Sequence, residues 1–105
     1  MMHFEQFRGS INDIFYTKHF RREAPLFDAE IILKSEFKTH LHKYEENIEG
    51  NHIFRALIEK KHYVYAIDKN NNLIMLRVIH NFKEYKKYLE NKKEIEKEIL
   101  SVVSV

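Results

Sequence analysis

The fold of this chain is decided by the stretch NHIFRALIEKKHYVYAIDKNNNLIMLRVIH, residues 51–80. Polar and apolar side chains alternate in it with a period of two, which is typical of β-strands. The alternation covers three segments, Ile53–Glu59, His62–Asp68 and Leu73–His80. Lys60-Lys61 forms the first connection and residues 69–72 the second, where asparagines tolerate the left-handed backbone of tight turns. The stretch therefore predicts a three-stranded antiparallel meander.

Simple hairpin registers, with Glu59 opposite His62 and Asp68 opposite Leu73, divide the side chains of the meander between two faces. The first face is apolar and is expected to form the core: Phe54, Ala56, Ile58, Tyr63, Tyr65, Ile67, Ile74, Leu76 and Val78. The second face is mixed: Arg55, Leu57, Glu59, His62, Val64, Ala66, Asp68, Met75, Arg77 and Ile79.

The segments before the meander are predicted to be mainly helical. Residues 2–7 are too short to assign by pattern, and an edge strand is one possibility. Ser10 is a plausible N-cap for a helix over residues 10–22, and Asp28 for a second helix over residues 28–48. Gly50 then supplies the stop. Apolar side chains of the second helix recur at steps of three and four, which is a helical spacing: Leu33, Phe37, Leu41, Tyr44 and Ile48.

A long helix over residues 81–103 is predicted after the meander. Asn81 is its N-cap and Glu84 follows three residues later, as in a capping box. Its apolar end is expected to pack on the first helix of the same chain or to contact a partner protein or a second copy, as in a homodimer. The residues predicted to bind that partner are Ile99, Leu100, Val102 and Val103.

The composition is that of one folded domain spanning residues 1–105. Hydrophobic residues make up 44% and charged residues 32%, and the formal net charge is only +2. That charge lacks the basic excess of a protein that neutralises many phosphates. The fold class predicted is α+β, with two N-terminal helices packed on a three- to four-stranded antiparallel sheet and a long C-terminal helix. The chain has no cysteine, long apolar run or secretory signal, so we expect a cytoplasmic protein without membrane contact.

Arg55 and Arg77 are the most informative charged pair. They lie on the outer strands of the predicted meander and flank the middle strand on its second face, within reach of one phosphodiester. Two guanidinium groups so placed bind phosphate oxygens and stabilise charge on a scissile phosphate. The alternative is that they pair with Glu59 and Asp68 on an ordinary solvated face.

His80 and Tyr85 are the other candidate catalytic residues. A histidine at the end of the last strand can act as a general acid or base near neutral pH, although strict alternation places His80 on the core side. A tyrosine one turn into the next helix can stack on a base, although such residues often belong to the core. His40 and His42, two residues apart on a predicted helix, point in different directions and cannot share a metal ion. We expect neither a metal nor another cofactor.

The residues Phe54-Arg55, the run Lys61–Asp68 (KHYVYAID) and Leu76–His80 followed by Tyr85 carry a resemblance to a known family. They are similar to the arginine-bearing strand, the following strand and the closing strand of the RelE/ParE/YoeB superfamily of small bacterial toxins. Ser10–Ile14 also resembles the start of that family's first helix. The resemblance implies a strand, two helices, a meander and a helix, if residues 2–7 form the strand.

The resemblance implies a RelE-like toxin, a ribosome-associated and metal-independent mRNA endoribonuclease of a toxin–antitoxin system. Its partners would then be an antitoxin and mRNA or the ribosome, with Arg55, Arg77, His80 and Tyr85 in the site. Lys60, Lys61 and His62 are predicted to contact nucleic acid. The alternative is a non-enzymatic phage or mobile-element protein that inhibits a host protein by direct protein–protein binding. A plain nucleic-acid-binding module is a third possibility.

Overall fold

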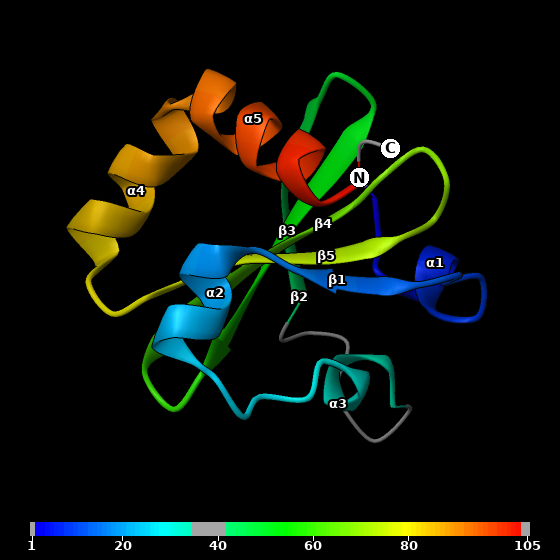
Figure 1. The fold of residues 1–105 in the computed structure, drawn as a ribbon, viewed down its shortest axis with the longest axis horizontal. Coiled ribbons are helices and arrows are strands. Elements are labelled where there is room, and N and C mark those ends of the chain that lie inside the picture. The colour runs from blue at the N-terminus through cyan, green and yellow to red at the C-terminus, as the bar shows by residue number, and fades with distance from the viewer. Residues whose placement is uncertain (1, 35–41, 104–105) are drawn as a thin grey trace.

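The computed structural model describes residues 2–34 and 42–103 (Figure 1). The chain is α+β, as predicted, with a C-terminal helical region. Its elements, in chain order, are α1 (Glu5–Arg8), β1 (Ile14–Tyr16), α2 (Lys18–Glu23), α3 (Glu30–Leu33), β2 (His42–Ile48), β3 (Asn51–Ile58), β4 (Lys61–Ile67), β5 (Leu73–Ile79), α4 (Phe82–Glu90) and α5 (Lys92–Val103).

The strands form one mixed sheet of five, in the order β1-β5-β4-β3-β2. Neighbouring strands from β2 to β5 are antiparallel, whereas β1 runs parallel to β5, with Ile14 opposite Leu73 and Tyr16 opposite Met75. The expectation of three or four purely antiparallel strands is therefore wrong in number and direction. The predicted meander itself is confirmed as β3, β4 and β5.

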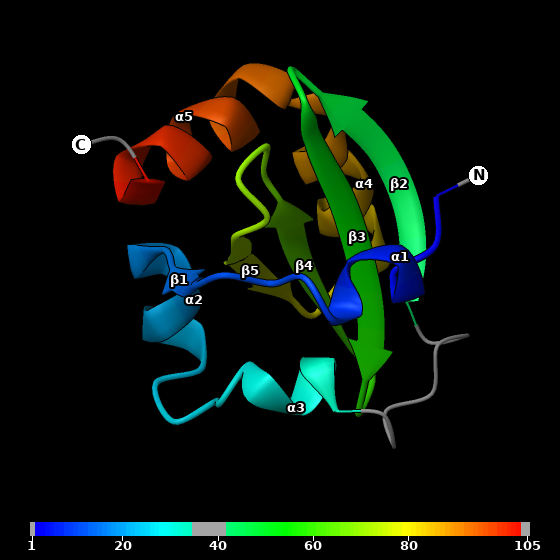
Figure 2. The same ribbon diagram turned by 90° about the vertical axis from the view of Figure 1, so that its right-hand side faces the viewer.

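Both faces of the sheet are covered, each by helices from one end of the chain (Figures 1 and 2). On the first face, Phe4 at the N-cap of α1, Phe20 of α2 and Ile32 of α3 belong to one core cluster with Phe54 and Tyr65. On the second face, four residues of α4 and α5 pack on the buried side chains of β3, β4 and β5; they are Tyr85, Tyr88, Ile95 and Ile99. The second face, predicted to be mixed, therefore carries a second apolar core as well as Arg55, His62 and Arg77.

The hairpin between β3 and β4 is in register two residues away from the simple prediction. Ile58 pairs with Lys61 and Leu57 with His62, so the turn consists of Glu59 and Lys60. A shift of two residues leaves every side chain on its expected face, because side chains of a strand alternate with a period of two. The assignment of β3 and β4 side chains to the two faces therefore holds.

A β-bulge changes the faces along β5. Tyr65 pairs with Met75 but Val64 pairs with Arg77, so Leu76 is the extra residue. Ile74 and Leu76 consequently lie in the core of the second face, and Met75 in that of the first. Both placements reverse the prediction. Arg77 keeps its expected side, because the bulge ends before it.

The N-terminal segments differ most from the prediction. The helix α1 (Glu5–Arg8) overlaps the possible edge strand 2–7, and the strand β1 lies inside the predicted helix 10–22. The run Ile14-Phe15-Tyr16 is β-branched and aromatic, and its pairing with β5 outweighs any helical preference. The cap of α2 is Thr17, whose Oγ1 accepts a hydrogen bond from the Phe20 amide at 3.1 Å, and not Ser10.

The predicted helix over residues 28–48 is also wrong. Among its described residues, 28–34 and 42–48, only Glu30–Leu33 is helical, and His42–Ile48 is a strand that pairs with β3. Phe37 and Leu41 lie outside the described residues. A step of four between Tyr44 and Ile48 fits the period of a strand as well as that of a helix, so the spacing was ambiguous. Gly50 has a φ of 87° as expected of a helix stop, but it serves the β2–β3 turn.

Asn81 caps α4 as predicted, since its Oδ1 accepts from the amides of Lys83 at 2.8 Å and Glu84 at 3.2 Å. The single long helix 81–103 is instead two helices, divided at Asn91. The Asn91 Oδ1 accepts from the Glu94 amide at 3.3 Å and so begins α5. The bend lets the chain stay against the sheet, which a straight helix of that length would overrun.

The β3–β4 turn gives a stability prediction. Glu59 and Lys60 have φ values of 50° and 68°, a left-handed conformation that costs a residue other than glycine about 1 kcal/mol. We expect Lys60→Gly to raise the free energy of unfolding by about 1 kcal/mol, measured by urea denaturation. The control is Lys61→Gly, in β4, which should lower it by a similar amount. A decrease for Lys60→Gly would contradict the role given to the backbone.

Candidate functional site

A cluster of titratable side chains lies where β1 ends. Because β1 pairs only with Leu73–Met75, the later part of β5 is flanked by α2 instead. Thr17 holds this junction: its hydroxyl donates to the Leu76 carbonyl at 2.6 Å, and its Oγ1 also caps α2. Thr17 is buried. The side chains of α2 are thereby fixed beside the end of β5.

A hollow of about 210 Å³ lies at this junction, and we call it the α2–β5 hollow. His80 Nε2 lies 3.4 Å from the Glu23 Oε2, and both side chains are solvent-exposed. Two histidines, two carboxylates and one guanidinium group therefore surround one small space. The lining residues are His19, Glu23, Arg77, Val78, Ile79, His80 and Glu84.

Arg77 is held from behind by α5. Its Nε donates to Glu98 Oε1 at 3.2 Å and its Nη2 donates to Glu98 Oε2, while Tyr88 donates to Oε1 at 2.9 Å. The Arg77 Cζ also lies 4.9 Å from the centroid of the Tyr88 ring. Although burial lowers it, the pKa of Arg77 is raised overall by the hydrogen bond and charge of Glu98. Burial and the charge of Glu98 likewise raise the pKa of Tyr88.

The Arg77–Glu98 pair fixes the guanidinium group of Arg77 but does not occupy all of its N–H donors. A guanidinium group has five N–H donors, and the Nε and Nη2 bonds to Glu98 occupy two of them. The side chain remains partly exposed and lines the α2–β5 hollow. Arg77 is therefore a rigid donor at the hollow, with much of its charge already balanced by Glu98.

A second cluster contains Arg55, His62 and Tyr85. The Arg55 Nη1 lies 3.2 Å from His62 Nδ1, and the His62 ring stacks on Tyr85 with centroids 4.7 Å apart and planes 5° apart. Arginine can only donate, so His62 Nδ1 accepts and the ring is neutral. Burial first, and then the charge of Arg55, lower the pKa of His62. Burial and the nearby Glu45 carboxylate raise the pKa of Tyr85.

The structure separates the four residues predicted to be catalytic. Arg55 and Arg77 both pair with Val64 across the sheet, so the predicted flanking positions are correct. Their guanidinium groups nevertheless contact different partners, since α4 and α5 cover that face. Only Arg77 and His80 line the α2–β5 hollow, while Arg55 and the buried Tyr85 do not. Arg55 contacts His62, and Arg77 contacts Glu98.

The other predicted contact residues are divided between surface and core. Lys60 is exposed in the turn, Lys61 is half-buried at the start of β4, and His62 is buried. Among the predicted partner-binding residues, Ile99 is buried in the core of the second face and Leu100 is exposed. Val102 and Val103 are half-buried against the same core. The helix α5 packs on β1 and β5 of its own chain.

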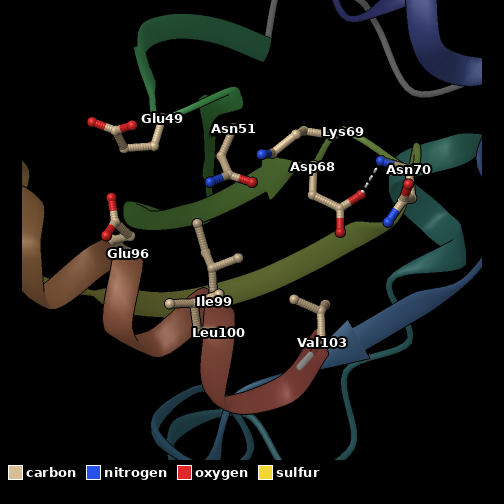
Figure 3. A pocket seen from close by; sticks show the side chains of 9 residues that line it. All are labelled: Glu49, Asn51, Asp68, Lys69, Asn70, Glu96, Ile99, Leu100 and Val103. Atoms are coloured by element: carbon tan, nitrogen blue, oxygen red, sulfur yellow. Dashed lines mark hydrogen bonds between the residues drawn. The ribbon is translucent and has the colours of Figure 1, made fainter. Parts of the chain in front are cut away.

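A larger hollow, of about 440 Å³, lies between α5 and two turns of the sheet (Figure 3); we call it the C-terminal hollow. Figure 3 shows the Glu49 and Glu96 side chains on one side and Asp68 on the other. The Asp68 Oδ1 accepts from the amides of Asn70 and Asn72, each at 2.9 Å, so this carboxylate is committed to the turn. The apolar side of the hollow is made by Ile99, Leu100 and Val103.

His42 gives a prediction about pH. Its ring stacks on Phe4 with centroids 4.1 Å apart and hydrogen-bonds the Tyr65 hydroxyl. Burial, and then the charge of Arg8, lower its pKa from 6.5 to about 4. Between these pH values the unfolded chain binds the proton and the folded chain does not. Stability is therefore full above pH 6.5 and falls as the pH drops towards 4, by about 1–2 kcal/mol after solvent screening.

The pH prediction is checked by urea denaturation of the wild type and of His42→Phe across this range. The phenylalanine keeps a ring against Phe4 but cannot titrate, so the difference in stability between the two proteins should change with pH. Other titrating groups cancel in that difference. A constant difference from pH 6.5 down to pH 4 would contradict the lowered pKa of His42.

Two residues of the α2–β5 hollow were missed in the sequence, His19 and Glu23. Both lie on a helix whose only local signal was Thr17 at its cap. Their neighbours in the hollow are far along the chain, since Glu23 and His80 are 57 residues apart. No local sequence pattern predicts that Glu23 and His80 lie close together, because their proximity depends on the pairing of β1 with β5.

Within residues 2–34 and 42–103, no three or more His, Asp or Glu side chains are grouped so that they could hold a metal ion. No helix in the described part of the chain has the length and apolar character needed to cross a membrane. Comparison with protein-family models, curated proteins and solved structures finds no match.

Proposed function

We propose that this protein is a RelE-like, metal-independent endoribonuclease that cleaves mRNA, with the α2–β5 hollow as its reactive centre. One observation carries the proposal: His80 and Arg77 from β5 and its end meet His19 and Glu23 from α2 around one space. Cleavage of RNA through its own 2′-hydroxyl needs a proton acceptor, a proton donor and a positive group near the phosphate. All three kinds of group are present in the hollow.

The chemistry assigned to each residue is a transesterification. Neutral His80, oriented by Glu23, takes the proton from the 2′-hydroxyl, and the 2′-oxygen forms a bond to phosphorus. The bond from phosphorus to the 5′-oxygen breaks, and that oxygen takes a proton from protonated His19. The products are a 2′,3′-cyclic phosphate and a 5′-hydroxyl. Arg77 donates to the phosphate oxygens from its free N–H groups, held in place by Glu98.

His80 and Glu23 are the residues to replace in testing this function. Arg77→Ala is unsuitable, because it would leave the Glu98 carboxylate buried without its partner. We expect His80→Ala to slow cleavage of single-stranded RNA, free or on ribosomes, by about 100-fold or more, and Glu23→Gln to slow it less. The rates are measured in the presence of EDTA, and the products are identified by mass. The same variants should lose the growth arrest that the wild type causes on expression.

Matched controls separate chemistry from folding. His3→Ala and Glu30→Gln change the same residue types at exposed positions away from the hollow, and both should cleave and arrest growth like the wild type. Thermal unfolding of all four variants should stay close to that of the wild type, since the replaced side chains are exposed. Absence of cleavage and arrest by the wild type, or full activity of His80→Ala, would overturn the proposal.

A second candidate function is inhibition of a host protein by direct binding at the C-terminal hollow. Leu100 is 52% exposed there, beside Val103 and the carboxylates of Glu49 and Glu96. Truncation of the end of α5 would also remove the buried Ile99. The test of partner binding therefore uses Leu100→Glu, which changes an exposed side chain alone. If growth arrest is lost with Leu100→Glu and kept with His80→Ala, binding and not cleavage is the activity. The opposite result favours the ribonuclease.

A further inference from the structure

The outward side of α4 carries an exposed aromatic ring, whereas the other aromatic side chains of this helix are buried. Tyr85 and Tyr88 point into the core of the second face, whereas Phe82 is 60% exposed. The Lys86 Nζ lies 5.9 Å from the centroid of the Phe82 ring. A surface hollow of about 450 Å³ is formed on this side, which we call the α4 outer face. It is lined by Phe82, Lys83, Lys86, Lys87 and Glu90.

The α4 outer face begins at the rim of the α2–β5 hollow. Phe82 is two residues after His80, and Glu84, within the first turn of α4, lines the α2–β5 hollow. The Phe82 ring also lies 6.0 Å from that of His62, which pairs with Ile79 at the end of β5. Figure 1 shows the start of α4 and the β3–β4 turn at the same end of the sheet. Phe82 and His80 thus lie two residues apart at one end of the sheet, within the span of one or two nucleotides.

We propose that the α4 outer face is a subsite for single-stranded RNA next to the scissile phosphate, an assignment that rests on the ribonuclease function proposed above. One base stacks on Phe82, and Lys83, Lys86 and Lys87 contact the phosphates that follow. An exposed aromatic ring among cations is the combination that single-stranded nucleic acids recognise. Three lysines against the one carboxylate of Glu90 make the lining positive.

The chemistry of Phe82 sets the specificity of this subsite. A phenylalanine ring has no hydrogen-bonding group, so it accepts any base by stacking and selects none. Stacking requires an unpaired base, and a duplex does not offer its bases in this way. The subsite therefore favours unpaired RNA of any sequence over double-stranded RNA.

The test is binding of a short, fluorescein-labelled 2′-O-methyl oligouridylate, which cannot be cleaved through its 2′-oxygen, followed by fluorescence anisotropy. We expect Phe82→Ala to weaken binding of the oligonucleotide about tenfold. Phe82→Trp keeps an aromatic ring at this position and should bind the oligonucleotide about as tightly as the wild type. Lys86→Ala with Lys87→Ala should weaken binding and make it less dependent on salt. The control, Lys93→Ala with Lys97→Ala, removes two exposed lysines from α5 and should change binding little.

The outcomes separate the subsite from the catalytic proposal. If the wild type cleaves RNA but Phe82→Ala binds the oligonucleotide as tightly as the wild type, the subsite is wrong and the ribonuclease stands. If Phe82 is needed for binding while no cleavage occurs, the subsite stands and the catalytic proposal falls. Equal binding of a duplex made with oligoadenylate, or an equal loss with the α5 lysine control, would also overturn the subsite.

Discussion

Replacing Glu98 with alanine should lower the free energy of unfolding by about 3–5 kcal/mol, the largest effect expected of any charged residue described here. Glu98 is a buried carboxylate that accepts from Arg77 and from the Tyr88 hydroxyl. Its loss leaves a half-buried guanidinium group and a buried hydroxyl without their acceptor. Removing one member of such a pair costs more than the pair contributes, because the remaining charge stays desolvated.

Urea denaturation and thermal unfolding measure this effect, and two further variants interpret it. Glu96→Ala, on the same helix but half-exposed, should change stability by less than about 0.5 kcal/mol. The double variant Arg77→Met with Glu98→Leu removes both charges and should recover much of the loss. If Glu98→Ala is no worse than Glu96→Ala, the interaction between Arg77 and Glu98 is not a buried pair in solution.

Replacing Ile99 with alanine should lower the free energy of unfolding by about 3 kcal/mol, whereas Leu100→Ala should change it by less than about 0.5 kcal/mol. These neighbours on α5 are 1% and 52% exposed. Ile99 packs in the core of the second face, and its truncation leaves a cavity among well-packed side chains. Leu100 projects at the edge of the C-terminal hollow (Figure 3).

The comparison tests whether α5 covers its own sheet. For a domain of this size, a loss of about 3 kcal/mol corresponds to a decrease in Tm of roughly 10–20 °C, easily seen by circular dichroism. Equal and small effects for Ile99→Ala and Leu100→Ala would mean that α5 is not packed on the sheet and is free to bind a partner. A large effect for Leu100→Ala alone would mean that the Leu100 side of α5, and not the Ile99 side, faces the sheet.

The meander was predictable from the sequence because its information is local. Strand alternation, two short turns and the Asn81 cap each lie within a few residues, and they placed the three strands and the start of α4, although the first turn is Glu59-Lys60 and the faces of Ile74, Met75 and Leu76 are reversed. The bulge at Leu76 was not predictable, since one extra residue in a strand leaves no compositional mark. The cover of α4 and α5 over the second face was not predictable either, because a period of two places side chains on two faces but does not say which helices cover each.

The strands β1 and β2 were missed for two different reasons. The spacing of Tyr44 and Ile48 suits a helix and a strand equally, so the β2 segment was assigned to the longer helical pattern. A three-residue parallel strand such as β1 carries no local signal of its partner, which is 59 residues away. The candidate site follows the same division. Arg77 and His80, on or next to the meander, were candidates from the sequence, whereas the positions of His19, Glu23 and Glu98 beside them depend on tertiary packing.

The parallel pairing of β1 with β5 has a consequence for the order in which parts of the molecule unfold. The β-hairpins join residues close in the chain, whereas β1 and α2 reach β5 across a long intervening segment. The entropy lost in closing a loop grows with its length, by about 0.6 kcal/mol for each doubling. The three residues of β1, the Thr17 bond and the burial of Phe20 must offset that loss. The wall of the α2–β5 hollow formed by His19 and Glu23 is therefore the part we expect to detach first, while the meander stays folded.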